Sequence, residues 1–292
     1  MKIEKSVNNR TQPPWQVWRI FRRLLRKPSG ITAMVLVGLL LIGAIFADLL
    51  APFDPLELVS TQRLAPPGGD YLLGTDDLGR DILSRVIFGS RISLRVGLIS
   101  VAISVLIGGP LGLIAGYTGG WFDEIAMRLM DILYSFPAII LAMLITAMLG
   151  PSLTNTMIAI GVVGAPGFSR IIRGPVLSEK EREYIQAARA LGASSLYLLY
   201  RHILPNIFAP ILVASTVSFS LALLSEAALS YLGLGVQPPE PSWGTMLLTG
   251  KRFFEIAPWT AIFPGLAIVI AVLGSNLLGD ALRDVLDPRL KK

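Results

Sequence analysis

The chain has 292 residues, of which 53% are hydrophobic and only 16% are charged. A soluble protein would carry roughly a quarter charged residues, so the composition excludes an ordinary soluble domain and indicates a protein that spans a lipid bilayer. Cysteine is absent, which excludes disulfides and thiolate metal sites. The net charge of +6 comes from bases beside apolar segments, and we attribute it to charge asymmetry across a membrane rather than to nucleic-acid binding.

Residues 1–30 are predicted to form a cytoplasmic tail with an amphipathic helix at the membrane surface. Such a helix lies in the plane of the interface with its bases among the lipid head groups. A disordered basic tail is the alternative. The pattern consists of large apolar residues at helical spacing opposite arginines (Trp15, Trp18, Phe21 and Leu25; Arg19, Arg22, Arg23 and Arg26).

Six apolar segments are long enough to cross a bilayer, which takes about 20 residues of helix. The first is longer than the apolar core of a signal peptide, so we expect it to be retained as a transmembrane helix. The predicted spans are 31–50, 95–117, 132–149, 153–171, 207–234 and 259–278.

An even number of spans places both termini on one side of the membrane. That side receives 19 of the 26 Lys and Arg residues and the other side receives 7, so the positive-inside rule makes it cytoplasmic. The main exceptions precede the second span, where we interpret 81–94 as an interfacial helix that holds its arginines among lipid head groups. These outer arginines are Arg80, Arg85, Arg91 and Arg95.

Glycines mark close packing in the second span. Gly108, Gly112 and Gly116 recur every four residues, a spacing that removes side chains from one stripe and lets another helix approach. We expect ordinary packing of transmembrane helices at this stripe, and helices that can slide or tilt.

Glu226 is the clearest ionisable residue inside a span. A carboxylate near the middle of the bilayer costs about 2.5–3.5 kcal/mol on insertion scales, so it should face protein or water and have a partner. Two interpretations stay open. Glu226 meets the amino group of a substrate, or it fixes helix packing by bonding a backbone turn or one of Ser225, Asn155 and Asn276.

The sequence contains no case for an enzyme. Residues 74–81 resemble a phosphate-binding loop but lack the Lys-Ser/Thr pair that reaches phosphate and magnesium. His202 is the sole histidine and has no carboxylate at metal-ligand spacing. We therefore predict no catalytic site, no metal site and no cofactor in this chain.

Residues 172–206 form the longest predicted cytoplasmic loop. Two short helices at an angle, the first rich in small side chains, suit insertion into a groove of a partner. A linker that touches only lipid is the alternative. The predicted order is a helix stop at Gly174-Pro175, a helix over 181–191, a break at Gly192 and a helix over 194–203 that ends at Leu204-Pro205.

This loop resembles the cytoplasmic motif in permease subunits of ABC importers, Glu-Ala-Ala-x3-Gly-x9-Ile-x-Leu-Pro. Gln186 stands in place of the Glu of the family, and His202 stands in place of the Ile. Three further segments, 74–85, 232–247 and 278–290, resemble the dipeptide, oligopeptide and nickel branch, most closely its "C" permease subunit. The positions that match the loop motif in register are Ala187, Ala188, Gly192, Leu204 and Pro205.

The resemblance implies an all-α membrane protein with six transmembrane helices of the type I ABC importer permease kind, a cytoplasmic coupling helix and the N-terminal amphipathic helix. It implies a multi-pass protein of the bacterial or archaeal cytoplasmic membrane. The implied division is a tail at 1–30, a first span at 31–50, an extracytoplasmic loop at 51–94, a five-helix core at 95–283 with the coupling loop at 172–206, and a C-terminal tail at 284–292.

The resemblance also implies partners: a second homologous permease, two ATP-binding subunits that hold ATP and magnesium, and an extracytoplasmic solute-binding protein. We expect three groups of site residues. Coupling to the ATPase involves Gln186, Ala187, Ala188, Gly192, Leu204 and Pro205; the substrate pathway Glu226, Ser225, Asn155 and Asn276; and contact with the binding protein Gln237 and Trp243. For the outer loop that holds Trp243, the alternative is a loop that only caps the helices, with the tryptophan as an interfacial anchor.

The expected function is the permease subunit of an ATP-driven importer of di- and oligopeptides. Import of nickel, a metal chelate or a glutathione-like solute is the alternative within the same architecture. A self-contained secondary transporter or channel is the alternative of another class, and paired intramembrane charges or an inverted repeat would favour it.

Overall fold

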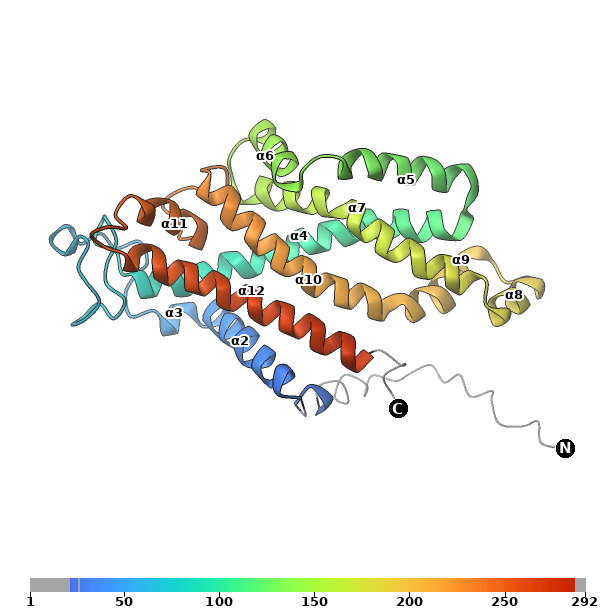
Figure 1. Cartoon of the computed structure of the whole chain (residues 1–292), viewed down its shortest axis with the longest axis horizontal. Coiled ribbons are helices and arrows are strands. Elements are labelled where there is room, and N and C mark those ends of the chain that lie inside the picture. The colour runs from blue at the N-terminus through green and yellow to red at the C-terminus, as the bar shows by residue number, and fades with distance from the viewer. Residues whose placement is uncertain (1–21, 26, 287–292) are drawn as a thin grey trace.

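The computed structural model describes residues 22–25 and 27–286, and every regular element in these ranges is helical (Figure 1). The predicted amphipathic helix of the N-terminal tail lies outside these ranges except for residues 22–25, and so does the end of the C-terminal tail. The elements are α2 (Pro28–Ile45), α3 (Ala47–Leu50), η1 (Ser60–Gln62), α4 (Ile82–Thr118), α5 (Gly120–Tyr134), α6 (Ala138–Leu149), α7 (Leu153–Lys180), α8 (Glu183–Ala190), α9 (Ser195–Leu198), η2 (Leu199–Ile203), α10 (Leu204–Tyr231), α11 (Trp243–Lys251) and α12 (Trp259–Leu286).

The long helices lie side by side along the longest axis of the molecule (Figure 1). α4 packs against α7, α10 against α12, and α12 against α2. α3, α11 and the loop between α3 and α4 gather at one end, whereas α8 and α9 lie at the other. We call these the α11 end and the α8 end.

Five continuous segments are long and apolar enough to cross a membrane: α2, α4, α7, the run from α9 to α10, and α12. α5 and α6 qualify only as a pair bent by 88°, so the predicted span over 132–149 contains a break, and the spans number six if the bent pair is counted as one. The N–H of Ser135 bonds back to the Asp131 carbonyl and ends α5. Pro137 has no N–H to continue an α-helix, and the chain turns there.

Several helices are longer than predicted, and α4 and α7 are the two whose extra length changes the interpretation. α4 begins at Ile82, so 81–94 is not a separate interfacial helix, and 51–94 is not wholly a loop. α7 continues through Pro175 to Lys180 rather than ending at Gly174-Pro175. Proline inside a long membrane helix is tolerated because neighbouring groups satisfy the carbonyl that it leaves free.

The outer arginines pair with acids rather than with lipid alone. Arg80 Nε lies 2.7 Å from Asp76 Oδ2, and Arg85 Nε lies 3.6 Å from the same oxygen. Arg85 is only 5% exposed and also donates to the Pro55 carbonyl at 2.9 Å. Buried charges are tolerated when they are paired and hydrogen-bonded in this way. The prediction that Arg80 and Arg85 face lipid head groups is therefore wrong, and internal ion pairs explain these bases.

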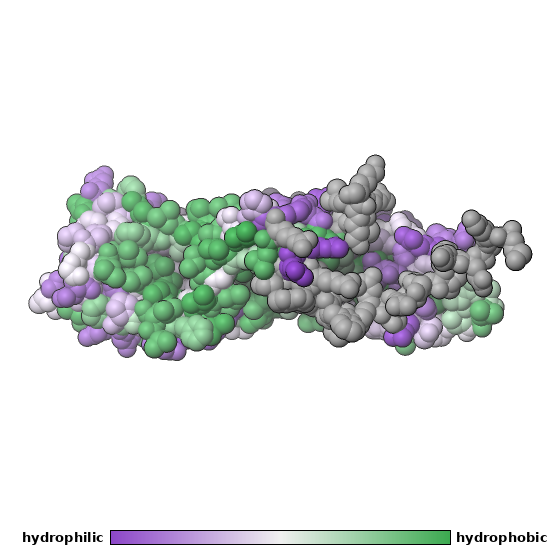
Figure 2. Space-filling view, turned by 90° about the horizontal axis from the view of Figure 1, so that it is seen from below, coloured by the Kyte–Doolittle hydropathy of each residue, from purple (hydrophilic) through white to green (hydrophobic). Residues whose placement is uncertain are grey.

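The face formed by α2 and α12 is apolar. Figure 2 shows a broad hydrophobic area on this face, with hydrophilic residues at the α11 end and again towards the α8 end. Exposed apolar surface of this extent is the pattern of a lipid-facing helix. The exposed residues include Val35, Leu39 and Ile42 of α2 and Leu266, Val269 and Leu273 of α12.

The glycine stripe of α4 packs against the backbone of α7. A Cβ added to Gly108 would lie 2.2 Å from the Ala165 carbonyl oxygen, and one added to Gly112 would lie 2.3 Å from the Ser169 carbonyl oxygen. Ser104 Oγ donates to the Gly161 carbonyl at 2.8 Å across the same contact. The predicted close approach is confirmed, and α7 is its partner.

We expect Gly112→Ala to lower the free energy of unfolding by about 1–3 kcal/mol, because the added methyl group has no room. Gly109→Ala is the matched control, since its Cβ would meet nothing closer than Ile172 Cδ1 at 3.6 Å. Both substitutions change helix propensity equally. Thermal unfolding of the purified chain in detergent measures the difference, and equal stability of the two variants would contradict close packing at Gly112.

Candidate functional site

The segment of residues 181–203, which we call the α8–η2 segment, covers the α8 end of the bundle. Its underside is fully buried at Ile185, Leu198 and Ile203. These side chains form one apolar cluster with Ile172 of α7 and Ile207 of α10. The segment is therefore packed onto the ends of both helices that it connects.

The opposite face of this segment is exposed and carries small and apolar residues beside charged ones such as Glu183 and Arg189. Gln186 and Ala187 are exposed, Ala188 is half-buried, and Leu191 is 90% exposed. Gly192 has a φ of +86°, a left-handed conformation that glycine adopts without strain. This glycine ends α8 and turns the chain, which leaves Leu191 at the tip.

Gln186 contacts its own segment: its Nε2 donates to the Glu181 carbonyl at 3.1 Å. Leu204 and Pro205 do not lie on the exposed tip. η2, a short π-helical turn, joins α9 directly to α10, so the predicted helix end at Leu204-Pro205 is wrong. Proline is tolerated there because it stands in the first turn of α10, and Leu204 packs against the apolar cluster.

Glu179, which the sequence analysis did not single out, accepts hydrogen bonds at the base of this segment. It lies in the last turn of α7 and is 8% exposed. Asn206 Nδ2 of α10 donates to its Oε1 at 3.0 Å, and Arg182 Nε lies 2.8 Å from its Oε2. Tyr184 Oη of α8 also donates to Oε1. An acid at a helix C-terminus, where the helix dipole disfavours it, was the available signal.

Burial and the Glu179 carboxylate raise the pKa of Tyr184 to about 12. A pKa above the ordinary value of 10.0 means that the protonated phenol is favoured in the folded state. Its hydrogen bond is complete below pH 10 and is lost as the pH rises through about 12. Tyr184 is therefore a constant donor at neutral pH.

His202 packs between two aromatic rings, with centroids 6.0 Å from Tyr184 and 5.4 Å from Tyr197. Over residues 22–25 and 27–286, the structure holds no group of three or more His, Asp or Glu residues that could bind a metal. The contacts of His202 are thus those of a packed side chain.

A cavity of about 460 Å³ lies between α4, α6, α7 and α10. This volume falls within the roughly 300–1,000 Å³ of small-molecule sites. Its walls are apolar apart from serine hydroxyls and one tyrosine, and no Asp, Glu, Lys, Arg or His lines it. The polar lining residues are Ser100, Ser104, Tyr134, Ser218 and Ser225.

Of the predicted pathway residues, only Ser225 lines this cavity. Glu226 is 1% exposed and accepts from Ser230 Oγ at 2.6 Å, which fits the packing interpretation. Asn155 Nδ2 donates to the Leu149 carbonyl at 2.9 Å and closes the turn between α6 and α7. Asn276 lies on an exposed face of α12, outside the cavity lining.

At the α11 end, Trp243 is 4% exposed and donates from Nε1 to the Val86 carbonyl at 2.9 Å. The prediction that it contacts a binding protein is therefore wrong, because it is a buried link between α11 and α4. Gln237 is exposed and donates to the Gly235 carbonyl at 3.0 Å. Of the two predicted contacts, Gln237 alone remains available to a partner.

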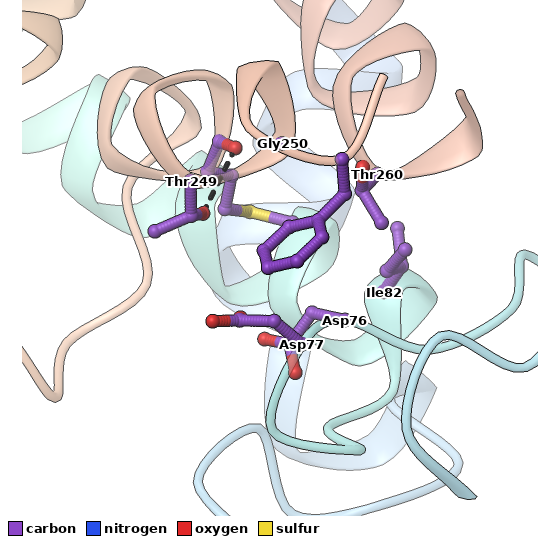
Figure 3. A pocket seen from close by; sticks show the side chains of 8 residues that line it. Asp76, Asp77, Ile82, Thr249, Gly250 and Thr260 are labelled. Carbon is purple, nitrogen blue, oxygen red and sulfur yellow. Dashed lines mark hydrogen bonds between the residues drawn. The ribbon is translucent and has the colours of Figure 1, made fainter. Parts of the chain in front are cut away.

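The turn over residues 74–81 binds its own chain rather than phosphate. Gly79 has a φ of +79°, and a Cβ there would lie 2.0 Å from the Val59 carbonyl oxygen. Figure 3 shows Asp76 and Asp77 of this turn facing Thr249, Gly250 and Thr260 across a small pocket. The pocket measures about 10 Å³, room for no more than about one water molecule, so it is too small for a substrate.

Two family profiles match the sequence. One is described as "Binding-protein-dependent transport system inner membrane component" and matches residues 108–292. The other is described as "N-terminal TM domain of oligopeptide transport permease C" and matches residues 14–67. The two matches follow one another along most of the chain.

Curated relatives match over nearly their full length. The "Dipeptide transport system permease protein DppC" of Alkalihalophilus pseudofirmus is 45% identical over 95% of this chain and 91% of its own. The "Di/tripeptide transport system permease protein DppC" of Pseudomonas aeruginosa is 46% identical over 96% and 93%. The "Glutathione transport system permease protein GsiD" of Pectobacterium atrosepticum is 45% identical over 99% and 94%.

Among solved structures, a chain of the MetNI methionine ABC transporter, titled as inward facing, has a TM-score of 0.59. The match covers 70% of this chain and 98% of that chain at 20% sequence identity. The likeness therefore concerns the fold, which is that of a type I ABC importer permease.

Ser230→Ala should destabilise the chain by about 1–3 kcal/mol, because it removes the hydroxyl that donates to the buried Glu226 carboxyl group and that accepts from the Val236 N–H. Ser225→Ala, one residue from Glu226 on the cavity side, is the control and should change stability by less than about 0.5 kcal/mol. Thermal unfolding in detergent compares them. A larger loss for Ser225→Ala would overturn the assignment of Glu226 to packing.

Proposed function

The chain belongs to the family of binding-protein-dependent transport system inner membrane components, and on this premise we propose that it is the permease subunit of an ATP-driven importer of di- and oligopeptides. The observation that carries the proposal is the pairing of a substrate-sized, uncharged cavity with an exposed apolar tip at one end of the same bundle. The substrate passes through the cavity, and the ATPase subunit contacts the tip and moves it.

We place the α8 end in the cytoplasm together with both termini. The count of Lys and Arg residues supports this orientation. The α11 end then faces outwards, where Gln237 and its neighbours meet a solute-binding protein. In this orientation the protein is a multi-pass subunit of a bacterial or archaeal cytoplasmic membrane.

The α8–η2 segment docks on an ATP-binding subunit. A segment whose underside is buried at Ile185 and whose tip exposes Leu191 presents apolar surface to the cytoplasm, and such surface is a common mark of a protein interface. Two ATP-binding subunits, one under this chain and one under a second homologous permease, hold ATP and magnesium. In this proposal ATP hydrolysis belongs to those subunits, and this chain moves in response to them.

The cavity suits a substrate that varies in charge. Its lining offers hydroxyls and apolar walls, so it makes no strong demand on peptide side chains, and selectivity falls to the binding protein. Relatives named for glutathione make a glutathione-like peptide the second candidate. A bare nickel ion fits less well, because the lining contains no imidazole or carboxylate to coordinate it.

The direct test is ATP-driven uptake of a labelled dipeptide into proteoliposomes that contain this chain, the second permease and both ATPase subunits, with the binding protein added outside. Unlabelled oligopeptides, glutathione and a nickel chelate are added as competitors. Uptake that requires ATP and is blocked by peptides supports the proposal. Transport by this chain alone, without ATPase subunits, would contradict it and favour a self-contained transporter.

Leu191→Glu should abolish co-purification of the ATPase subunits and ATP-driven uptake, while thermal stability stays within about 0.5 kcal/mol, as for other exposed positions. Leu58→Glu, the same exchange at an exposed position of the α11 end, is the control and should keep the ATPase subunits bound. Affinity capture of the complex in mild detergent measures both. If Leu191→Glu assembled normally, docking at this tip would be excluded.

A further inference from the structure

Three elements meet at the carboxylate of Glu179. It belongs to the last turn of α7, and its donors are Asn206 of α10 at 3.0 Å, Arg182 at 2.8 Å, and Tyr184 of α8. Asn206 Nδ2 also donates to Tyr184 Oη at 2.8 Å. The contacts among Glu179, Tyr184 and Asn206 therefore form a closed ring that joins α8 to both helices flanking the α8–η2 segment.

The apolar cluster beneath the segment does not provide this constraint by itself. Burial of Ile185 and Ile203 holds the segment on the bundle, but the hydrophobic effect is non-directional and allows the packed surfaces to slide. Hydrogen bonds to an ionised carboxylate are short and directional. The ring therefore fixes the orientation of α8 relative to α7 and α10, whereas the apolar cluster only keeps them in contact.

The position of Glu179 is unfavourable for α7 itself. A negative charge in the last turn of a helix opposes the helix dipole, and the side chain is 8% exposed. Its donors compensate for both costs, and all three lie outside α7. Glu179 therefore stabilises the contact between α7, α8 and α10 rather than the end of α7.

The two helices joined at Glu179 also form the cavity. α7 contributes Phe168 and Ile171 to the lining, and α10 contributes Ala214 and Ser218. Each of these residues lies within a few helical turns of the ring. A rotation of α8 that is transmitted rigidly to α7 and α10 would therefore change the cavity walls.

We propose that Glu179 is a positioning residue, which locks the coupling helix α8 to α7 and α10 so that movement of the ATPase subunit reaches the cavity. This inference rests on the proposed function, because it assumes that α8 receives that movement. Without these hydrogen bonds, α8 can rotate on the ATPase subunit without moving α7 and α10. ATP hydrolysis then continues with less transport.

The test uses the full reconstituted importer and measures ATP hydrolysed per dipeptide imported, normalised to the ATPase subunits present. Glu179→Gln keeps the size of the side chain but removes its charge, and we expect the ratio to rise by about fivefold or more, the lower end of typical coupling effects. Glu124→Gln, at an exposed glutamate of α5, is the matched control. It should keep the ratio of the unaltered complex.

Tyr184→Phe and Asn206→Leu each remove one donor and retain the carboxylate, so they test the ring if Glu179→Gln fails to assemble. Each should also raise the ratio. A merely structural role would lower the amount of complex and leave the ratio unchanged, and that result overturns the proposal. An unchanged ratio in assembled Glu179→Gln does the same.

Failure of the proposed function looks different. If the unaltered complex hydrolyses ATP but imports no peptide, the substrate assignment fails. The lock is then tested by stimulation of ATP hydrolysis by the binding protein, which Glu179→Gln should reduce and Glu124→Gln should leave intact. Equal stimulation in both variants would overturn the lock independently of the substrate.

Discussion

The close crossing of α4 and α7 is the contact on which the other parts of the molecule depend. Glycine at 108 and 112 allows the two backbones to approach within the reach of the Ser104 hydroxyl, which donates to the Gly161 carbonyl. Because interhelical packing in lipid relies on van der Waals contact and hydrogen bonds rather than on the hydrophobic effect, a stripe without side chains is the efficient solution. The cavity then lies beside this crossing, with one wall from each helix.

The crossing also links the two ends of the protein. α4 extends from the buried Arg85 at the α11 end to Tyr117 at the α8 end, where the Arg189 guanidinium lies 5.4 Å from the ring centroid of Tyr117. α7 carries cavity residues in its middle and Glu179 in its last turn. Both surfaces that we propose as partner contacts are therefore attached to helices that line the cavity.

The sequence predicted the other five spans, the glycine stripe and the helix break at Gly192, because each follows from a local rule: apolar length, residue size and backbone conformation. Prediction from the sequence failed where the burial of a residue depends on contacts with residues far away in the chain. Arg85 is buried where it donates to the Pro55 carbonyl, 30 positions away, and the burial of Trp243 depends on the Val86 carbonyl, 157 positions away. The sequence alone does not distinguish a buried tryptophan in an outer loop from an exposed one. Glu179 was missed for the same reason, since its donors lie on other elements and only its unfavourable place at a helix end was visible.

The π-helical turn η2 places one extra residue between α9 and α10. In an α-helix each residue advances the chain by about 100° around the axis, so a change of register within residues 199–203 would turn everything before it by that angle relative to α10. Leu198, now fully buried, would leave the apolar cluster. The number of residues in η2 is thus as constrained as their type. A family member that gained or lost a residue here would present a different surface at the α8 end.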